Sequence, residues 1–195
     1  MKQLVKGLFI LNLLLVLTSC NDADIEAAKG ITTTFNFREF FRGNVEGWGT
    51  VENWRGEVKK TFKVHINGVW DDGLSTITET SEFNDGSTLE RSWKIILTPK
   101  GQYAASTDDV VGNALGFESG NAAQFSYVMK FPFAKNDIEV KVTNQMFVLN
   151  DGTVIASISM RKFGFKVGEI NVFMKKKDTK ENTWPIHKKK KTIVG

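Results

Sequence analysis

Apolar and polar residues alternate along much of the chain between residues 45 and 174. Every second position is mainly apolar or aromatic in four segments, residues 58–66, 91–97, 123–131 and 138–142. The positions between them are mostly polar, as Lys59, Thr61 and Lys63 illustrate. This two-residue period is typical of antiparallel strands with one face in a core and the other in water. The region predicts roughly nine or ten strands, without a long helix or an internal repeat.

Turn dipeptides divide the alternating segments. Asn and Asp followed by Gly tolerate the positive φ angles that short hairpins require. A sheet with this many strands must close or split to protect its edges. Successive hairpins with strands of about ten residues favour an all-β, antiparallel up-and-down barrel of the lipocalin (calycin-like) type, with a β-sandwich as the alternative. The four dipeptides are Asn67-Gly68, Asp72-Gly73, Asp85-Gly86 and Asp151-Gly152.

An aromatic segment precedes the strands. Phenylalanines stand at positions 35, 37, 40 and 41, with Asn36 placed to cap a helical turn and Gly43 placed to end it. So short a helix is not stable alone and has to pack against a larger element. We expect this turn to begin a β-barrel domain over residues 35–176 and to plug one open end of the barrel.

Residues 1–19 have the features of a bacterial lipoprotein signal peptide. Lys2 and Lys6 form a basic start, residues 7–17 are almost entirely apolar, and the run ends in LTSC at positions 17–20. The apolar run is shorter than the roughly 20 residues that a transmembrane helix needs. Small residues before Cys20 match a lipobox, in which a peptidase cleaves before the cysteine and the thiol receives a diacylglycerol. A plain secretory signal and a buried N-terminal helix are the alternatives.

Acylation at Cys20 predicts where the protein resides. Residues 20–34 are polar and become a lipidated tether, which holds the domain in the cell envelope on the periplasmic side. In enterobacterial lipoproteins an Asp after the cysteine favours the inner membrane, so Asn21 favours the outer membrane. Cys20 is the one cysteine of the chain, and its acylation leaves no thiol for disulfide, redox or metal chemistry.

Positive charge is concentrated at the two ends of the chain. The formal net charge is +4, yet residues 21–174 contain 16 basic and 20 acidic residues. The body of the domain is therefore not expected to bind nucleic acid. Residues 177–195 are predicted to form a basic, disordered tail. Four residues of this tail are candidates for contact with anionic lipid headgroups, namely Lys188, Lys189, Lys190 and Lys191.

Catalytic and metal-binding patterns are not recognisable in the sequence. His65 shares the polar face of its strand with Lys63, and His187 lies in the tail, so neither is expected to act as a general base. Asp108 and Asp109 are adjacent and point to opposite faces of a strand, which prevents them from sharing a proton. The Asp-Gly pairs lack the ligand spacing of a calcium loop. We expect no enzymatic activity, no metal and no cofactor.

Candidate ligand-binding residues are expected at the barrel mouth. Inward Phe, Trp, Tyr and Met side chains either fill a barrel solidly or line an apolar cavity. Asp109, Asn121 and Lys162 are the polar candidates for holding the headgroup of a ligand. For Asp109 the alternative is a structural one, hydrogen bonding to backbone amides at a bend. The glycines between residues 112 and 120 are typical of bulges or strand bends.

Six short motifs occur in order across about residues 35–176. They are FREFF at 37–41 with Gly43, GWG at 47–49, DDVVG at 108–112, GNA at 120–122, LNDG at 149–152 and KFGFKVGE at 162–169. Together they resemble a family of bacterial lipoproteins catalogued as domain of unknown function 3833. The resemblance implies an envelope lipoprotein with no established activity.

Two functional hypotheses follow from the sequence, beside a hydrolase or isomerase that is disfavoured because no positioned nucleophile–base pair appears. In the first, the lipid-anchored barrel binds a hydrophobic ligand, such as a fatty acid or another lipid, and polar groups at its mouth hold the headgroup. In the second, the protein is a structural or assembly lipoprotein with a solid core that acts through protein contacts. The volume inside the barrel distinguishes the two.

Overall fold

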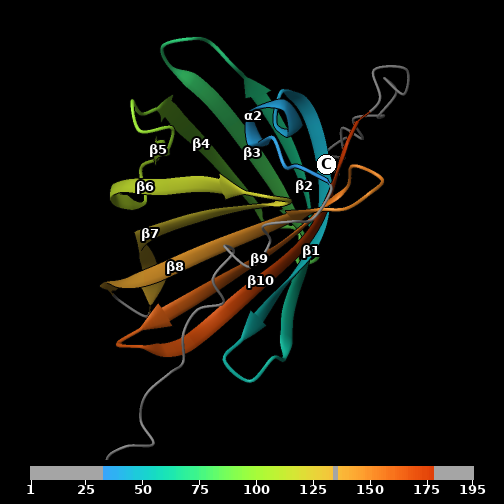
Figure 1. Cartoon of the computed structure of the whole chain (residues 1–195). Helices are drawn as coiled ribbons and strands as arrows, with labels where there is room; N and C mark the ends of the chain where they lie inside the picture. The colour runs from blue at the N-terminus through green and yellow to red at the C-terminus, as the bar shows by residue number, and fades with distance from the viewer. Residues whose placement is uncertain (1–32, 134–135, 178–195) are drawn as a thin grey trace, which may run out of the picture.

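A closed antiparallel barrel makes up nearly all of the structure. The computed structural model describes residues 33–133 and 136–177, and these residues form ten strands and one helical turn (Figure 1). Each strand pairs with its neighbours in sequence, and β1 pairs with β10 to close the sheet. The predicted all-β up-and-down barrel is confirmed, and the closed sheet rules out the β-sandwich. The elements are α2 (Phe37–Phe40), β1 (Gly43–Asn53), β2 (Val58–Val69), β3 (Ser75–Phe83), β4 (Thr88–Leu97), β5 (Tyr103–Ser106), β6 (Val110–Ser119), β7 (Ala122–Phe133), β8 (Asn136–Val148), β9 (Val154–Lys162) and β10 (Phe165–Lys176).

Side chains alternate between the lumen and the outer surface, as the sequence pattern predicts. On β2, Val64 and Ile66 are buried, whereas the intervening His65 is partly exposed. On β8, Val140 and Val142 are almost completely buried, and Lys141 between them is exposed. The pleat of each strand therefore sends one set of side chains into the barrel.

The helical turn α2 plugs one end of the barrel. Asn36 caps it as predicted, because its side-chain oxygen accepts a hydrogen bond from the Glu39 amide at 2.9 Å. Phe37 and Phe40 are buried and join the main core of the barrel. Figure 1 shows α2 at the end opposite the β1–β2 and β9–β10 turns. We call these two ends the plugged end and the mouth.

Hydrogen bonds from the barrel wall hold the plug. The Phe35 amide donates to the Gly120 carbonyl oxygen at 2.9 Å. The carboxylate of Glu118 accepts from the Phe37 amide and from the Tyr103 hydroxyl, the latter at 3.4 Å. Burial, together with this neighbouring carboxylate, raises the pKa of Tyr103 to about 12. Glu118 thus satisfies an amide at the start of α2 that the turn itself leaves without a partner.

One predicted turn is wrong. Asn67-Gly68 lies inside β2, where Gly68 pairs with Ile77 of β3. A Cβ atom at Gly68 would lie 1.7 Å from the carbonyl oxygen of Phe41, so this glycine gives the plug segment room against the strand. The other three dipeptides lie in the β2–β3, β3–β4 and β8–β9 connections, as predicted.

The glycine bulge in β6 is confirmed. Gly112 has a φ of 73°, a value that residues with a Cβ atom adopt at a cost. The register between β6 and β7 shifts between Val111 and Leu115. The extra residues bend the strand beside the lumen.

Several predictions concern residues outside the described ranges. They are the signal peptide over residues 1–19, the acylation of Cys20, most of the tether, and the basic tail with Lys188 to Lys191. Within residues 33–133 and 136–177, no helix is long and apolar enough to cross a membrane.

Candidate functional site: a cavity inside the barrel

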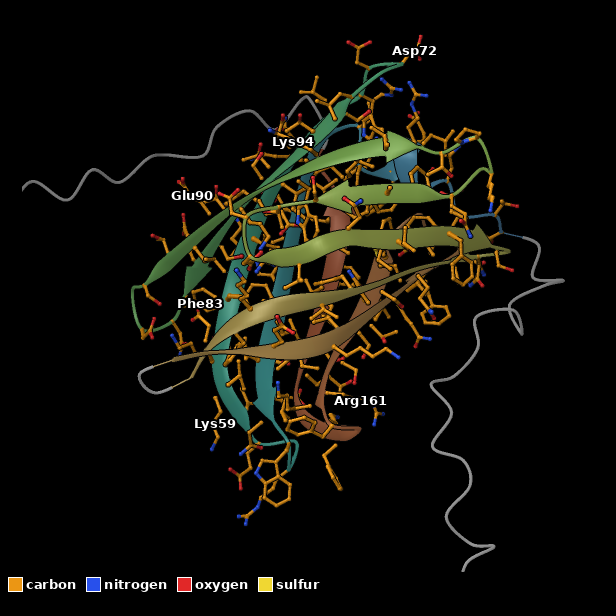
Figure 2. All side chains as sticks on the ribbon, turned by 90° about the vertical axis from the view of Figure 1, so that its left-hand side faces the viewer. Lys59, Asp72, Phe83, Glu90, Lys94 and Arg161 are labelled. Atoms are coloured by element: carbon orange, nitrogen blue, oxygen red, sulfur yellow. The ribbon has the colours of Figure 1, made fainter. Side chains whose placement is uncertain are left out.

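A large cavity occupies the lumen between the plug and the mouth. Its volume is about 710 Å³, within the range of about 300–1,000 Å³ typical of ligand pockets. It reaches Phe41 at the plugged end and Asn53, Lys59 and Phe83 toward the mouth. Figure 2 shows Lys59 and Arg161 near the mouth and Asp72 at the plugged end. The barrel is therefore hollow rather than solidly packed.

Most of the cavity wall is apolar. Its side chains come from the inward positions of strands all around the barrel, and a second, smaller hollow of about 100 Å³ lies beneath Phe37 of the plug. Methionines contribute flexible walls that adapt to irregular shapes. Representative lining residues of the large cavity are Phe62, Val64, Met129, Val142, Met160 and Ile170.

A polar cluster interrupts this apolar wall. Glu79 on β3 and Arg91 on β4 stand directly opposite each other in the strand register. The Arg91 Nη2 atom donates to the Asp109 Oδ2 atom at 2.5 Å. Tyr127 lies next to this group, with its ring centroid 5.6 Å from that of Trp93. We call Glu79, Arg91, Asp109 and Tyr127 the polar cluster, and all four line the large cavity.

The Arg91–Asp109 pair bridges a shortened part of the barrel wall. β5 has four residues and pairs with residues 94–97 of β4, so the first part of β4 lacks a β5 partner. Asp109 lies in the connection between β5 and β6 and reaches Arg91 across this gap. The side chains of Arg91 and Asp109 are 20% and 34% exposed. The ion pair thus replaces backbone pairing at this level of the wall.

Burial shifts the pKa of two members of the polar cluster, Glu79 and Tyr127. It raises the pKa of Glu79, and Arg91 and a hydrogen bond with Trp93 oppose this effect only in part. It also raises the pKa of Tyr127, because the phenolate would be costly in this environment. Burial therefore makes loss of the proton less favourable at both Glu79 and Tyr127.

Two buried oxygen atoms that belong to cavity-lining residues have no hydrogen-bond partner. One is Asp109 Oδ1, and the other is Asn144 Oδ1 on β8. Asn144 lines both the large and the small hollow. An unsatisfied buried polar atom costs about 1–3 kcal/mol, so both atoms are ready to accept a hydrogen bond from a bound molecule.

The three residues proposed from the sequence lie in different places. Asp109 lines the cavity, and its side chain bonds to Arg91 rather than to backbone amides. Asn121 lies at the plugged end, where its Nδ2 atom donates to the Val148 carbonyl oxygen at 3.3 Å. Lys162 ends β9 at the mouth, with its Nζ atom 4.9 Å from the Phe163 ring centroid. The structure does not bring the three together, and neither Asn121 nor Lys162 is among the residues that line the cavity.

The sequence reasoning missed Glu79, Arg91 and Asn144. A usable signal was present, because Arg91 occupies the same face of its strand as Trp93 and Ile95. Likewise, Glu79 falls in step with the buried Ile77. A charged residue at an inward position needs a partner or a function. That argument marks both positions even without coordinates.

The outer surface holds the histidine considered from the sequence. His65 lies on the outside of β2, with its Nδ1 atom 3.6 Å from Glu46 Oε1. Partial burial lowers its pKa, and Lys63 adds to this effect. No cluster of three or more His, Cys, Asp or Glu residues suited to a metal ion occurs within the described part of the chain.

A family model covers the barrel and its cavity. The model is described as "Protein of unknown function (DUF3833)" and matches residues 14–176. This segment contains every strand and the helical turn described above. A search of curated proteins finds no match.

Proposed function

The chain belongs to the family of proteins of unknown function DUF3833, as its six motifs indicate, and from this premise we propose that it is a lipid-anchored envelope protein whose barrel binds a hydrophobic ligand. The ligand class is a fatty acid or another lipid. The anchor is the acylated Cys20, on the periplasmic side and at the outer membrane. The barrel removes the chain of the ligand from water.

The observation that supports binding is the hollow, apolar lumen of about 710 Å³. Apolar surface buried against such a wall contributes about 25 cal/mol per Å². A protein that acts only through its outer surface has no need of such a volume, since a packed core is more stable. The lumen therefore favours a ligand-binding role over the purely structural one.

A displacement assay on the wall of the lumen tests this role. The purified full chain is titrated with the neutral dye N-phenyl-1-naphthylamine, whose fluorescence rises in apolar surroundings. Ala156 is 1% exposed and lines the cavity, so Ala156→Phe fills part of the lumen. Ala104 alternates with the buried Tyr103 and Ala105 and faces outward, which makes Ala104→Phe a matched control.

We expect dye binding by the wild type and by Ala104→Phe, and at least a fivefold weaker affinity in Ala156→Phe. Native mass spectrometry should also find a lipid that co-purifies with the wild type. Repeated apo preparations without dye binding would defeat the proposal. Equal affinities in all three proteins would place the dye outside the lumen and defeat it as well.

The lipid anchor has a separate test. The features that support it are the basic start, the short apolar run and the small residues before Cys20. Metabolic labelling with a palmitate analogue should mark the wild type and leave Cys20→Ser unlabelled. Label retained by Cys20→Ser would show that another residue is modified.

A further inference from the structure

We infer that the group of the ligand which reaches the polar cluster is a neutral hydrogen-bond donor, a hydroxyl, and not a carboxylate. The ligand class is then a long-chain alcohol or a hydroxyl-bearing lipid. This inference rests on the proposed function, because it identifies the chemistry of a ligand in the same lumen. Two observations support the inference: the hydrogen-bond acceptors in the lumen that have no partner, and the ion pair between Arg91 and Asp109.

The unpaired atoms in the lumen are hydrogen-bond acceptors. Asp109 Oδ1 and Asn144 Oδ1 are buried without a partner, and both residues line the large cavity. The amide of Asn144 can turn to present its nitrogen, but the carboxylate oxygen of Asp109 that pairs with no other group only accepts. A ligand hydroxyl donates one hydrogen bond and satisfies such an atom, whereas a carboxylate or an ester cannot.

The cation of the cluster is already neutralised. Arg91 donates to Asp109 and stands opposite Glu79 in the strand register. A ligand carboxylate beside Arg91 would also lie beside the Asp109 carboxylate, which already pairs with this cation. Like charges this close are unfavourable in a site of low polarity. An uncharged head avoids that repulsion and leaves the Arg91–Asp109 pair intact.

Three ligands of equal chain length separate the alternatives: 1-dodecanol, dodecanoate and methyl dodecanoate. Each competes with N-phenyl-1-naphthylamine for the full chain at neutral pH. We expect 1-dodecanol to displace the dye at a concentration at least fivefold lower than either of the others. The methyl ester is the control for the apolar chain, since its head lacks a donor.

Asp109→Asn provides the sharper test, because it removes the negative charge that neutralises Arg91 and keeps the side-chain shape. In this variant dodecanoate should gain at least fivefold and displace the dye at lower concentration than 1-dodecanol. Asn144→Leu removes the other acceptor, and it should weaken 1-dodecanol severalfold while leaving methyl dodecanoate unchanged.

The outcomes distinguish this inference from the proposed function. If the wild type binds the dye but binds dodecanoate as tightly as 1-dodecanol or more tightly, the hydroxyl assignment is wrong and the proposed function still stands. The hydroxyl assignment is also wrong if a folded Asp109→Asn protein still binds 1-dodecanol more tightly than dodecanoate. It is wrong as well if Asn144→Leu binds 1-dodecanol as tightly as the wild type does. Absence of binding by the dye and all three ligands overturns the proposed function and the inference together.

A second inference concerns the outer surface and rests on a different observation. Four large apolar side chains form a continuous row across β8, β9, β10 and β1, which lie side by side (Figure 1). The strand registers align Trp48 with Phe173, Phe173 with Ile155, and Ile155 with Phe147. Trp48 and Phe173 are each 40% exposed, and Ile155 is 45% exposed. We call these four residues the apolar row.

Polar residues border the apolar row on the side of the mouth. The next outward row toward the mouth consists of Thr50, Asn171, Ser157 and Gln145, matched in the same registers. Two lysines flank the tryptophan, since the Nζ atoms of Lys63 and Lys175 lie 5.5 and 5.6 Å from the Trp48 ring centroid. An aromatic ring beside lysine ammonium groups suits the boundary between lipid chains and headgroups.

The N-terminal segment enters the barrel beside this row. The Thr33 hydroxyl donates to Asn150 Oδ1 at 3.0 Å, in the connection between β8 and β9, the strands that carry Phe147 and Ile155. Cys20 precedes Thr33 by 13 residues, a length that spans at most about 45 Å. An anchor at Cys20 thus tethers this side of the barrel close to the bilayer.

The geometry points to the apolar row as a contact surface for an anionic lipid bilayer. The full chain is reconstituted on vesicles of brominated phosphatidylcholine with phosphatidylglycerol, and bromine quenches tryptophan fluorescence within the acyl region. Trp48→Phe should lose at least half of the quenchable fluorescence. Trp54, on the β1–β2 turn and 61% exposed, is the control, and Trp54→Phe should lose none.

A further variant, Phe173→Ser, should reduce the quenching of tryptophan fluorescence by brominated lipid, because it weakens the contact between the apolar row and the bilayer. Quenching that is unchanged in both Trp48→Phe and Phe173→Ser would overturn the inference. So would a stable complex in which a protein partner protects Trp48 from brominated lipid, because the row would then be a protein interface.

Discussion

Gly68 and Phe41 are in direct contact, since a Cβ atom on the glycine would lie 1.7 Å from the Phe41 carbonyl oxygen. The glycine is part of β2, and the phenylalanine follows α2, so this contact joins the barrel wall to its plug. The backbone of the plug segment thus fits against β2 because residue 68 is a glycine and has no Cβ atom.

Gly68→Ala is therefore expected to displace the plug. The added methyl group forces the Phe41 backbone away, at a cost of about 1–3 kcal/mol in the free energy of unfolding. Urea denaturation measures this loss. Gly73→Ala is the control, because nothing lies within 4 Å of a Cβ atom at Gly73. Equal stability of the two variants would contradict the proposed contact.

Phe37→Ala is expected to loosen the plugged end. Phe37 is 5% exposed and lies 5.1 Å from Tyr103 and 4.8 Å from Phe125, measured between ring centroids. Removing such a ring costs about 3–5 kcal/mol. Thermal unfolding should show the loss, and amide hydrogen exchange should rise in α2. Phe163→Ala, at a residue 87% exposed, should leave both measurements as in the wild type.

The Arg91–Asp109 pair is expected to show energetic coupling. Arg91→Met and Asp109→Leu each leave a charged group in the lumen without its partner, which costs about 1–3 kcal/mol. The double variant removes both charges, so its loss should be smaller than the sum of the single losses by about 0.5–3 kcal/mol. Strictly additive losses in urea denaturation would show that the two side chains do not interact.

Glu79 is expected to make the wild type less stable as the pH rises. Burial raises its pKa in the folded protein above the ordinary 4.5, so the folded state binds this proton more tightly than the unfolded state. Its contribution to stability is present below pH 4.5 and is lost as the pH rises through the raised pKa.

Glu79→Gln removes this titration while keeping the shape of the side chain. The free energy of unfolding of the wild type, minus that of Glu79→Gln, should fall as the pH rises from about 4 to about 9. Residues such as Glu46 and Glu169, whose pKa values are lowered, titrate in both proteins and cancel in the difference. A difference that stays constant with pH would refute the raised pKa.

Local rules of sequence were sufficient for most of the fold. The two-residue period reflects the pleat of a strand, which is a local property, and it assigned inward residues such as Val140 and Val142 correctly. The Asn36 cap and the bulge at Gly112 follow equally local rules. Asn67-Gly68 failed, because the role of Gly68 depends on Phe41, which is distant in sequence.

The ion pair, the apolar row and the cavity depend on how the strands pair when the sheet closes. Arg91 and Asp109 are separated by 18 positions and meet because β5 is short, and the apolar row exists because four registers align. Whether inward Phe and Met side chains fill a barrel or line a cavity depends on its diameter and on the directions of many side chains at once. The sequence by itself determined the strands and the family, because these follow from patterns along the chain, and the acylation of Cys20 stays a prediction from the same kind of pattern. The hollow lumen and its polar cluster arise only from contacts between distant residues, and only the tertiary structure decided them.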